Sequence, residues 1–262
     1  MPVRIMRKLA AGSVLTLGLG LPSGGVSQAA SGAAAGNYSD SFAGYAAGEY
    51  SGDVIPRSVA ADWTQPRARA HGYRDAYAAI FAGFSDINNS GFNSGLNSEM
   101  PQIGTEVDVI GGEPQYYAWY ALGGYQGDPR IRIRRTVRPG DHLQASITCG
   151  GPLRDSYTLR LTDISPRGRW TQTERVDSQE VQAPDGMSVG VTSPRFGLAL
   201  LTDFRAASFS GVNFNGHVIG SVAPYIGHYD YVNPDSESHV LATTSGLGAA
   251  GNSFTVTWRR QR

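Results

Sequence analysis

The sequence is poor in cysteine and lysine, and the shortage of cysteine limits how the protein can be stabilised. Cys149 is the only cysteine and Lys8 the only lysine among 262 residues. A chain with one thiol has no internal disulfide, so its stability must come from a buried core. Because no base is visible beside Cys149, we interpret it as a small buried side chain rather than a nucleophile.

The chain also lacks a surplus of positive charge. Lys+Arg 22 and Asp+Glu 22 give a formal charge of +0, and residues 1–29 hold three of the basic residues and no acidic one. The remainder is slightly acidic, whereas a dedicated nucleic-acid binder needs basic residues to neutralise phosphates. We therefore expect no nucleic-acid partner.

Only one long apolar run is present, from Leu9 to about Leu21. Basic residues precede it and the small residues Ser27 and Ala29 follow it, which is the layout of a secretory signal; the run is too short to span a bilayer. We predict that residues 1–29 are a signal peptide, that the protein is secreted, and that it has no membrane partner. The alternative is a buried N-terminal helix.

The segment 30–56 has almost no aliphatic side chains. Alanine, glycine, serine and scattered tyrosine dominate it. Such a composition cannot bury enough apolar surface to offset the entropy of ordering. We predict a flexible leader or pro-segment here, followed by one folded domain over residues 57–262.

No stretch keeps a helical period for three turns. Short runs of period two, separated by Gly, Pro, Asn and Asp, instead predict roughly ten or more strands. They include a strand within 75–84 and hairpins over 105–122, 130–149 and 157–176. The sequence therefore predicts an all-β fold, an antiparallel β-sandwich of two packed sheets.

Several familiar catalytic motifs are missing, including G-x-S-x-G, H-E-x-x-H and a glycine-rich phosphate loop. His217, His228 and Asp230 are conceivable metal ligands, but their spacing matches no standard site, and we expect no metal and no cofactor. The arginines of "RIRIRR", residues 130–135, alternate with isoleucines, which favours a solvated sheet face over anion recognition.

One predicted hairpin is unusually polar. In "QIGTEVD" the two-residue alternation of a strand places Gln102, Glu106 and Asp108 on one face. Gln102 and Glu106 lie about 13 Å apart along that strand, too far to act together directly. These side chains form either the wet face of a sheet or the lining of a cleft.

The stretch "QIGTEVDVIGGEPQYYAWYALGG" resembles the signature of the glutamic peptidases, the eqolisin family, which show Q-x-G-T-E-x-D, a turn, and then Y-Y-A-W-Y-E. Stretches from about Asp62 to about Phe214 resemble the family in the same order, among them "ADWTQP", "FAGFSD" and "VRPGDHLQASIT". The resemblance implies a concanavalin-like sandwich of two bent sheets. It also implies a secreted endopeptidase that works in acid without a cofactor.

The resemblance further implies roles for individual residues. Gln102 matches the glutamine that orients the attacking water and stabilises the oxyanion, and Glu106 matches an acidic position that supports the site. Trp63 matches a tryptophan of the substrate cleft. We assign substrate binding to Trp63, Phe81, Tyr117 and Trp119.

The family's catalytic glutamate, carried in A-E-W-I-V-E-A-P, has no visible counterpart. Aligning the prolines puts Ser188 and Thr192 on the two glutamate positions, and the other alignment puts Arg195 and Ala199 there. One hypothesis is an acid endopeptidase whose general base comes from elsewhere, such as Glu106 or Asp185. The other is a sandwich that has lost the chemistry and binds peptide, glycan or a partner protein. We expect the protein to be a monomer and its substrate or ligand to be a polypeptide.

Overall fold

The computed structural model describes residues 37–48, 55–72, 74–85, 100–122, 130–151, 156–177, 184–193, 199–222, 226–233 and 236–260. All of them belong to one compact unit, Ala33–Arg262. This part of the chain forms strands and one short 3-10 turn, and the described residues include no α-helix. The predicted all-β sandwich is confirmed. The predicted signal peptide lies outside the described residues.

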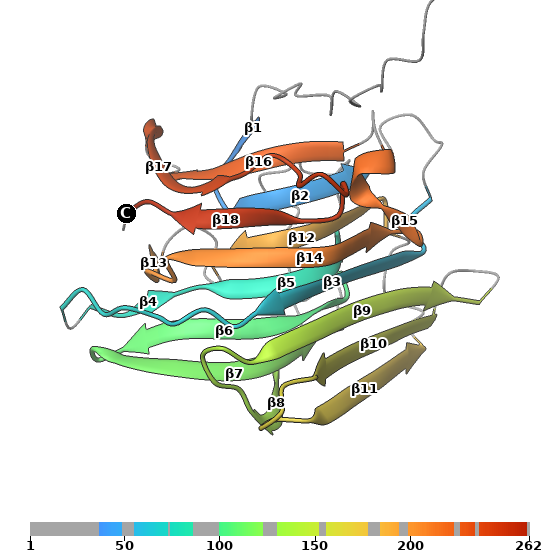
Figure 1. Ribbon diagram of the computed structural model, residues 1–262, viewed down its shortest axis with the longest axis horizontal. Coiled ribbons are helices and arrows are strands. Elements are labelled where there is room, and N and C mark those ends of the chain that lie inside the picture. The colour runs from blue at the N-terminus through green and yellow to red at the C-terminus, as the bar shows by residue number, and fades with distance from the viewer. Residues whose placement is uncertain are drawn as a thin grey trace, which may run out of the picture. The chain divides into compact units, whose positions relative to one another are not determined.

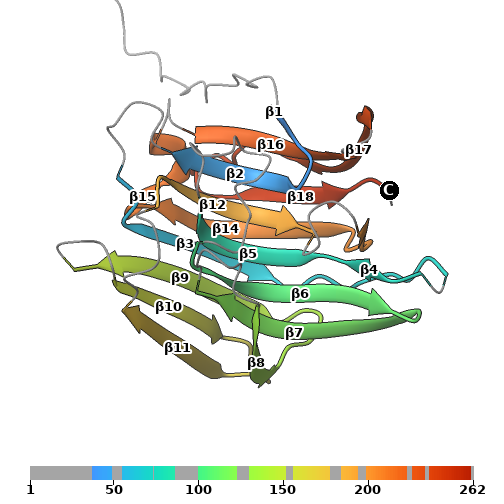
Figure 2. The ribbon, with the colours of Figure 1, turned by 180° about the vertical axis from the view of Figure 1, so that it is seen from behind.

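The first sheet contains the polar hairpin. In order across the sheet its strands are β8 (Ile131–Thr136), β7 (Glu113–Ala121), β6 (Gln102–Ile110), β5 (Ala79–Ser85), β12 (Gly186–Thr192), β2 (Phe42–Gly48) and β16 (Ile226–Asn233). Each pairs antiparallel with the next. The short strand β1 (Asn37–Ser39) adds to β16 in parallel. In Figure 2 this sheet faces the viewer.

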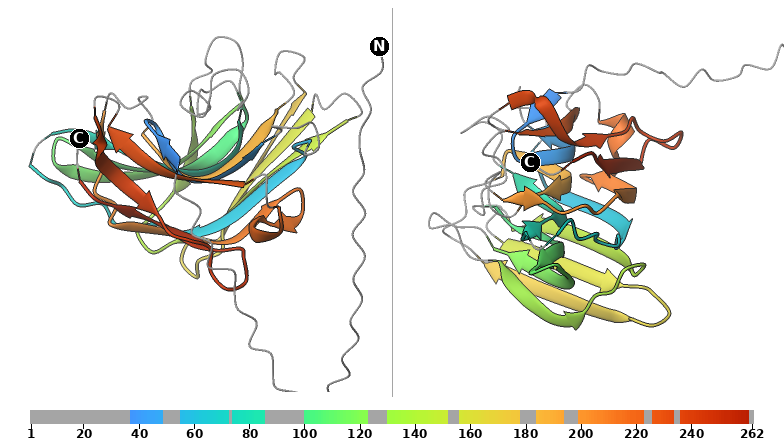
Figure 3. Two further views of the ribbon diagram at one scale, coloured as in Figure 1. Left: turned by 90° about the horizontal axis from the view of Figure 1, so that it is seen from above. Right: turned by 90° about the vertical axis from the view of Figure 1, so that its left-hand side faces the viewer.

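The second sheet packs against the first. Its strands are β11 (Trp170–Asp177), β10 (Ser156–Asp163), β9 (His142–Gly150), β3 (Ser58–Thr64), β14 (Ala206–Phe214), β18 (Phe254–Trp258) and β17 (Ser236–Thr244), all antiparallel (Figure 1). β16 also pairs with β17, which joins the two sheets along one side. Both sheets bend strongly, as Figure 3 shows from above.

Short elements complete the described chain. β4 (Ala76–Tyr77) pairs with β13 (Leu200–Leu201) in parallel, and β15 (His217–Val218) pairs with the end of β14. A 3-10 turn follows at Ile219–Ser221.

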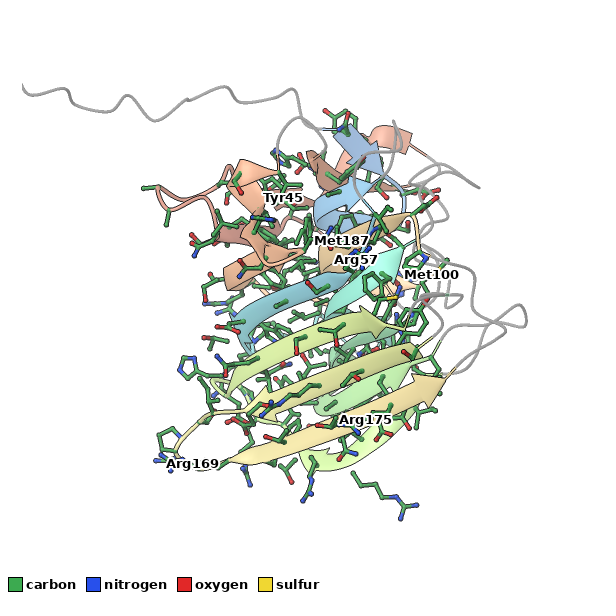
Figure 4. The ribbon with its side chains drawn as sticks, turned by 90° about the vertical axis from the view of Figure 1, so that its right-hand side faces the viewer. Tyr45, Arg57, Met100, Arg169, Arg175 and Met187 are labelled. Atoms are coloured by element: carbon green, nitrogen blue, oxygen red, sulfur yellow. The ribbon has the colours of Figure 1, made fainter. Side chains whose placement is uncertain are left out.

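The main core lies between the two sheets. Alternate residues of each strand point into it, for example Met187 of β12 and Tyr45 of β2 (Figure 4). From the second sheet, Phe209 and Phe254 stack with their ring centroids 4.7 Å apart. A fully buried side chain of this size contributes about 1.5–3 kcal/mol. Cys149 packs half-buried against this core, as a structural side chain does.

The polar hairpin closes as predicted, with β6 and β7 paired over their whole length. Gly111 and Gly112 form the two-residue turn, and both have positive φ, +58° and +86°. A tight hairpin turn of this kind needs positive φ at both positions, which glycine adopts without strain. The hairpin of β10 and β11 is also confirmed.

The predicted hairpin over 130–149 is wrong. β8 pairs with β7 in the first sheet, whereas β9 pairs with β3 and β10 in the second. The "RPGD" turn at 138–141 therefore carries the chain from one sheet to the other. A turn motif shows where the chain changes direction but not which strand comes next to it.

The prediction of a flexible segment over 30–56 is wrong for residues 37–48. Phe42–Gly48 forms β2, a fully buried interior strand between β12 and β16. Its small residues suit close packing, because the Phe42 ring lies directly over Gly44 and Gly190 where side chains would otherwise stand. The folded domain therefore begins before residue 57.

Candidate functional site

The polar residues of β6 lie on the face of the first sheet that points away from the main core. Gln102, Glu106 and Asp108 share this face, as the alternation predicted, and each is at most 3% exposed. Phe81 and Trp119 lie on the same face as part of a second, smaller apolar cluster. We call this surface the Gln102 face.

A row of three residues crosses the Gln102 face from β6 to β12. Gln102 pairs with Gly83 of β5, and Gly83 pairs with Ser188 of β12. The Gln102 side chain passes over Gly83, since a Cβ added to Gly83 would lie only 2.7 Å from Gln102 Cγ. Across two strand spacings, roughly 10 Å between Cα atoms, the residue opposite Gln102 is therefore Ser188.

Further along β6 lies a buried carboxyl pair. Arg130 donates to Glu106 Oε1 in an ion pair. Tyr117 donates its hydroxyl to Asp108 Oδ2 at 3.1 Å. The Arg130 guanidinium also lies 4.2 Å above the centre of the Trp119 ring, and that of Arg132 lies 4.5 Å above Tyr117.

One guanidinium balances only one of these two carboxylates. Burial raises the pKa of Glu106 to about 8, against the opposing effect of Arg130 and with a further increase from Asp108. Burial likewise raises the pKa of Asp108 to about 6, against hydrogen bonds from Tyr117 and the Ala78 amide. One proton on either of the two carboxyl groups makes the cluster neutral with Arg130.

The aromatic residues assigned to the site do not all lie on the same side of the first sheet. Phe81, Tyr117 and Trp119 lie on the Gln102 face, with Phe42 beside Phe81 at 6.1 Å between ring centroids. Trp63 does not join them. It lies in the main core, on the other side of β6, where its indole donates to Thr105 Oγ1 at 3.1 Å. The structure therefore places Trp63 apart from the other three residues assigned to substrate binding.

Four buried atoms that can donate a hydrogen bond lack a partner on the Gln102 face among the residues that the structure describes. They are Gln102 Nε2, Trp119 Nε1, Ser188 Oγ and Ser85 Oγ. Two carboxyl oxygens on the same face, Glu106 Oε2 and Asp108 Oδ1, are also unpaired there. Buried polar groups are almost always paired, so four unpaired donors on one face indicate that a ligand or ordered water completes them.

Comparisons with solved structures support the fold. Scytalido-glutamic peptidase with a peptide-based transition state analogue matches with a TM-score of 0.61 and 14% identity, over 84% of this chain and 98% of that one. An eqolisin bound to a tripeptide matches with a TM-score of 0.59 and 13% identity, over 84% and 98%. Aspergilloglutamic peptidase from Aspergillus niger matches with a TM-score of 0.52 and 18% identity, over 70% and 99%.

This chain has the fold of the glutamic peptidases. The matched 84% is more than residues 57–262 can supply, so the glutamic-peptidase fold includes part of the segment that contains β2. The sequence itself matches no protein-family model and no curated protein.

Sequence reasoning missed Arg130 as a site residue. The pattern "RIRIRR" favoured a solvated face, and Arg132, Arg134 and Arg135 are indeed exposed. Arg130 stands just before β8, where the chain directs its side chain onto Trp119 and Glu106. In the sequence, only the neighbouring acids Glu106 and Asp108 indicated that a cation had to lie close to them.

The histidines considered as metal ligands do not belong to a metal-binding cluster in the described part of the chain. Within the described ranges, no group of three or more His, Cys, Asp or Glu side chains could hold a metal ion. His228 stacks on Tyr45 and lies 3.7 Å from Asp230, and His217 stands exposed on β15. No helix in the described part of the chain is long and apolar enough to cross a membrane.

Proposed function

We propose that this protein binds an extended polypeptide on the Gln102 face and does not hydrolyse it through a glutamine–glutamate pair. The observation that carries the proposal is the row Gln102–Gly83–Ser188, in which a serine stands opposite the glutamine. The described strand β12, Gly186–Thr192, contains no carboxylate. A serine hydroxyl stays protonated in acid and cannot act as the general base without another base beside it.

The chemistry of the unpaired atoms supports a peptide as the ligand. Gln102 Nε2 and Trp119 Nε1 are pure donors, and the hydroxyls of Ser85 and Ser188 can also donate. A polypeptide in extended form presents carbonyl oxygens at regular intervals to such donors. The aromatic rings of Phe81 and Tyr117 supply apolar contacts for its side chains. Because these groups are buried, a peptide reaches them only when this face opens.

A second candidate function is acid hydrolysis in which the Glu106–Asp108 pair supplies the general base. In its favour, burial raises the pKa of both carboxyl groups, which lie on the same face as Gln102. Against it, Glu106 is ion-paired to Arg130 and lies about 13 Å along β6 from Gln102. Asp185, the other candidate for the general base, precedes β12 and lies three residues before Ser188 in the chain.

Peptide binding is tested by titrating the full chain with a library of short unstructured peptides in isothermal calorimetry at acid pH. Gln102→Ala removes a donor of the face, and its matched control is Gln144→Ala, an exposed glutamine on β9. We expect binding that Gln102→Ala weakens about tenfold, as the loss of one good hydrogen bond in a dry site predicts, and that Gln144→Ala leaves unchanged. Equal effects of the two variants, or no binding, would contradict the proposal.

We also propose that the protein is a secreted monomer. The layout of residues 1–29 supports secretion. N-terminal sequencing of the protein recovered from culture medium tests cleavage near Ala29, and sedimentation of that protein tests the monomer. An uncleaved, cell-retained chain would contradict secretion.

A further inference from the structure

The β8 edge of the Gln102 face carries an exposed arginine, Arg132. β8 is the last strand of the first sheet and pairs with β7 alone among the described strands (Figure 2). Arg132 stands directly opposite Trp119 of β7, so the two side chains share the Gln102 face. We propose that the polypeptide bound on this face carries an acidic side chain, which Arg132 binds. This assignment rests on the proposed peptide binding.

Arg132 is held in place by the tyrosine beneath it. Its guanidinium lies 4.5 Å above the centre of the Tyr117 ring, and the Tyr117 hydroxyl donates to Asp108 Oδ2 at 3.1 Å. A ring that is fixed through its hydroxyl is a rigid support for a stacked guanidinium. Because the guanidinium is already positioned, little conformational entropy is lost when it binds a ligand.

The two arginines that stack on aromatic rings of this face differ in their partners. Arg130, above Trp119, forms the ion pair with Glu106. The ion pairs found among the described residues do not involve Arg132. A planar guanidinium with free N–H groups binds a carboxylate through two parallel hydrogen bonds. The Trp119 indole, opposite Arg132, is buried and its Nε1 is one of the unpaired donors, so a ligand at this edge can satisfy both residues.

Further positive charge follows Arg132 along β8. The register between β7 and β8 shifts between Tyr117 and Ala118, which leaves Arg134 and Arg135 without a partner on β7. Both arginines are exposed. Bulges of this kind are common beside binding sites, where they redirect side chains. Three exposed guanidinium groups at one edge attract an acidic peptide and repel a basic one.

The acidic groups of the Gln102 face leave Arg132 free to bind a carboxylate at pH 5. Burial raises the pKa of Glu106 to about 8 and that of Asp108 to about 6, so both are largely protonated there, whereas a glutamate of a peptide is largely ionised. Glu113 is exposed on the same face but lies four residues along β7 from Tyr117, about 13 Å, which exceeds the Debye length of about 8 Å at physiological salt. The strands β5, β12 and β2 carry no charged side chain.

The test is a calorimetric titration of the full chain with short peptides at pH 5. The peptides are acetylated and amidated, and consist of alanine and serine with one phenylalanine, as an apolar anchor, and one glutamate whose position varies along the set. The tightest-binding peptide is then compared with its glutamine analogue in the wild-type protein and in Arg132→Gln. Arg160→Gln is the matched control, because Arg160 is an exposed arginine on β10 of the second sheet.

We expect one glutamate position to bind about tenfold more tightly than its glutamine analogue, the effect of one charge-assisted hydrogen bond. Arg132→Gln should abolish this preference and Arg160→Gln should keep it, with both variants folded by circular dichroism. The proposal is overturned if glutamate and glutamine peptides bind the wild-type protein equally, if the preference survives in Arg132→Gln, or if it is the same at every glutamate position. If no peptide binds the wild-type protein, the proposed peptide binding itself fails, and the role of Arg132 with it.

Discussion

Arg130 and Glu106 form an ion pair across β7, the strand that separates β8 from β6. Arg130 is the cation found beside the two buried carboxyl groups, Glu106 and Asp108. The electrostatics of the Gln102 face follow from this imbalance, since one of the two carboxyl groups must keep a proton to avoid a buried unbalanced charge.

Replacing Arg130 by glutamine tests the ion pair. The Arg130→Gln variant leaves Glu106 buried without its cation, so we expect a loss of about 3 kcal/mol in the free energy of unfolding near neutral pH. The loss should be smaller in acid, where both carboxyl groups are protonated. Urea unfolding at two pH values measures it. Arg132→Gln is the control: its guanidinium lies over Tyr117 but is exposed, so it should cost less than about 1 kcal/mol. Equal costs would contradict the role of Arg130.

The carboxyl pair also predicts how stability depends on pH. Burial raises the pKa of Glu106 from 4.5 to about 8 and that of Asp108 from 3.8 to about 6. The folded protein therefore holds protons that the unfolded chain releases, and the contribution of this pair to stability is largest below about pH 4. The contribution is lost as the pH rises through about 6 and about 8.

Thermal unfolding across this pH range measures the effect. We expect the Tm of the wild-type protein to fall between acid and mildly alkaline pH, and Glu106→Gln to flatten that dependence. A Tm that rises over the same range, or an unchanged profile in Glu106→Gln, would show that the pair does not hold a proton.

Sequence alternation predicted the shared face of Gln102, Glu106 and Asp108, because one strand has a strict period of two. The same reasoning applied to "SVAADWT" would have placed Trp63 in the core, since Val59, Ala61 and Trp63 alternate with less buried positions. The resemblance to glutamic peptidases instead suggested a cleft residue, whereas the alternation predicts the burial in the main core that the structure shows.

Two features could not be predicted from local patterns. The composition of β2 predicts a flexible segment because it has few aliphatic residues. In the structure, β2 instead pairs with a strand on each side, and the ring of Phe42 packs over Gly44 and Gly190. The approach of Arg130 to Glu106 depends on β8 pairing with β7, which is a long-range choice between sheets. Both features arise from tertiary packing rather than from propensity.

Gly83→Ala tests the position of the Gln102 side chain. A Cβ at Gly83 would lie 2.7 Å from Gln102 Cγ, so the glutamine must move from its place over β5. We expect a loss of about 1–3 kcal/mol in stability and a loss of peptide binding. Gly246→Ala is the control, because nothing lies within 4 Å of a Cβ there. Unchanged peptide affinity in Gly83→Ala would show that Gln102 is not part of the binding surface.

Ser188→Glu tests whether a carboxylate opposite Gln102 is the missing catalytic part. We expect this variant to gain slow cleavage of denatured protein in acid, whereas Ser188→Gln, of the same size and without a carboxylate, should gain none. The double variant Ser188→Glu, Gln102→Ala should lose the gained activity. Mass spectrometry of the fragments measures each case. No cleavage by a folded Ser188→Glu variant would show that more than this carboxylate is absent.

The most direct test of the central claim is to incubate the purified wild-type protein with denatured protein substrate between about pH 2 and about pH 5, the range in which a carboxylate pair would act. Fragments are detected by mass spectrometry, and circular dichroism confirms that the sandwich stays folded. We predict no cleavage at any pH in this range. Cleavage that disappears in Gln102→Ala would contradict the account and establish the protein as a working acid peptidase.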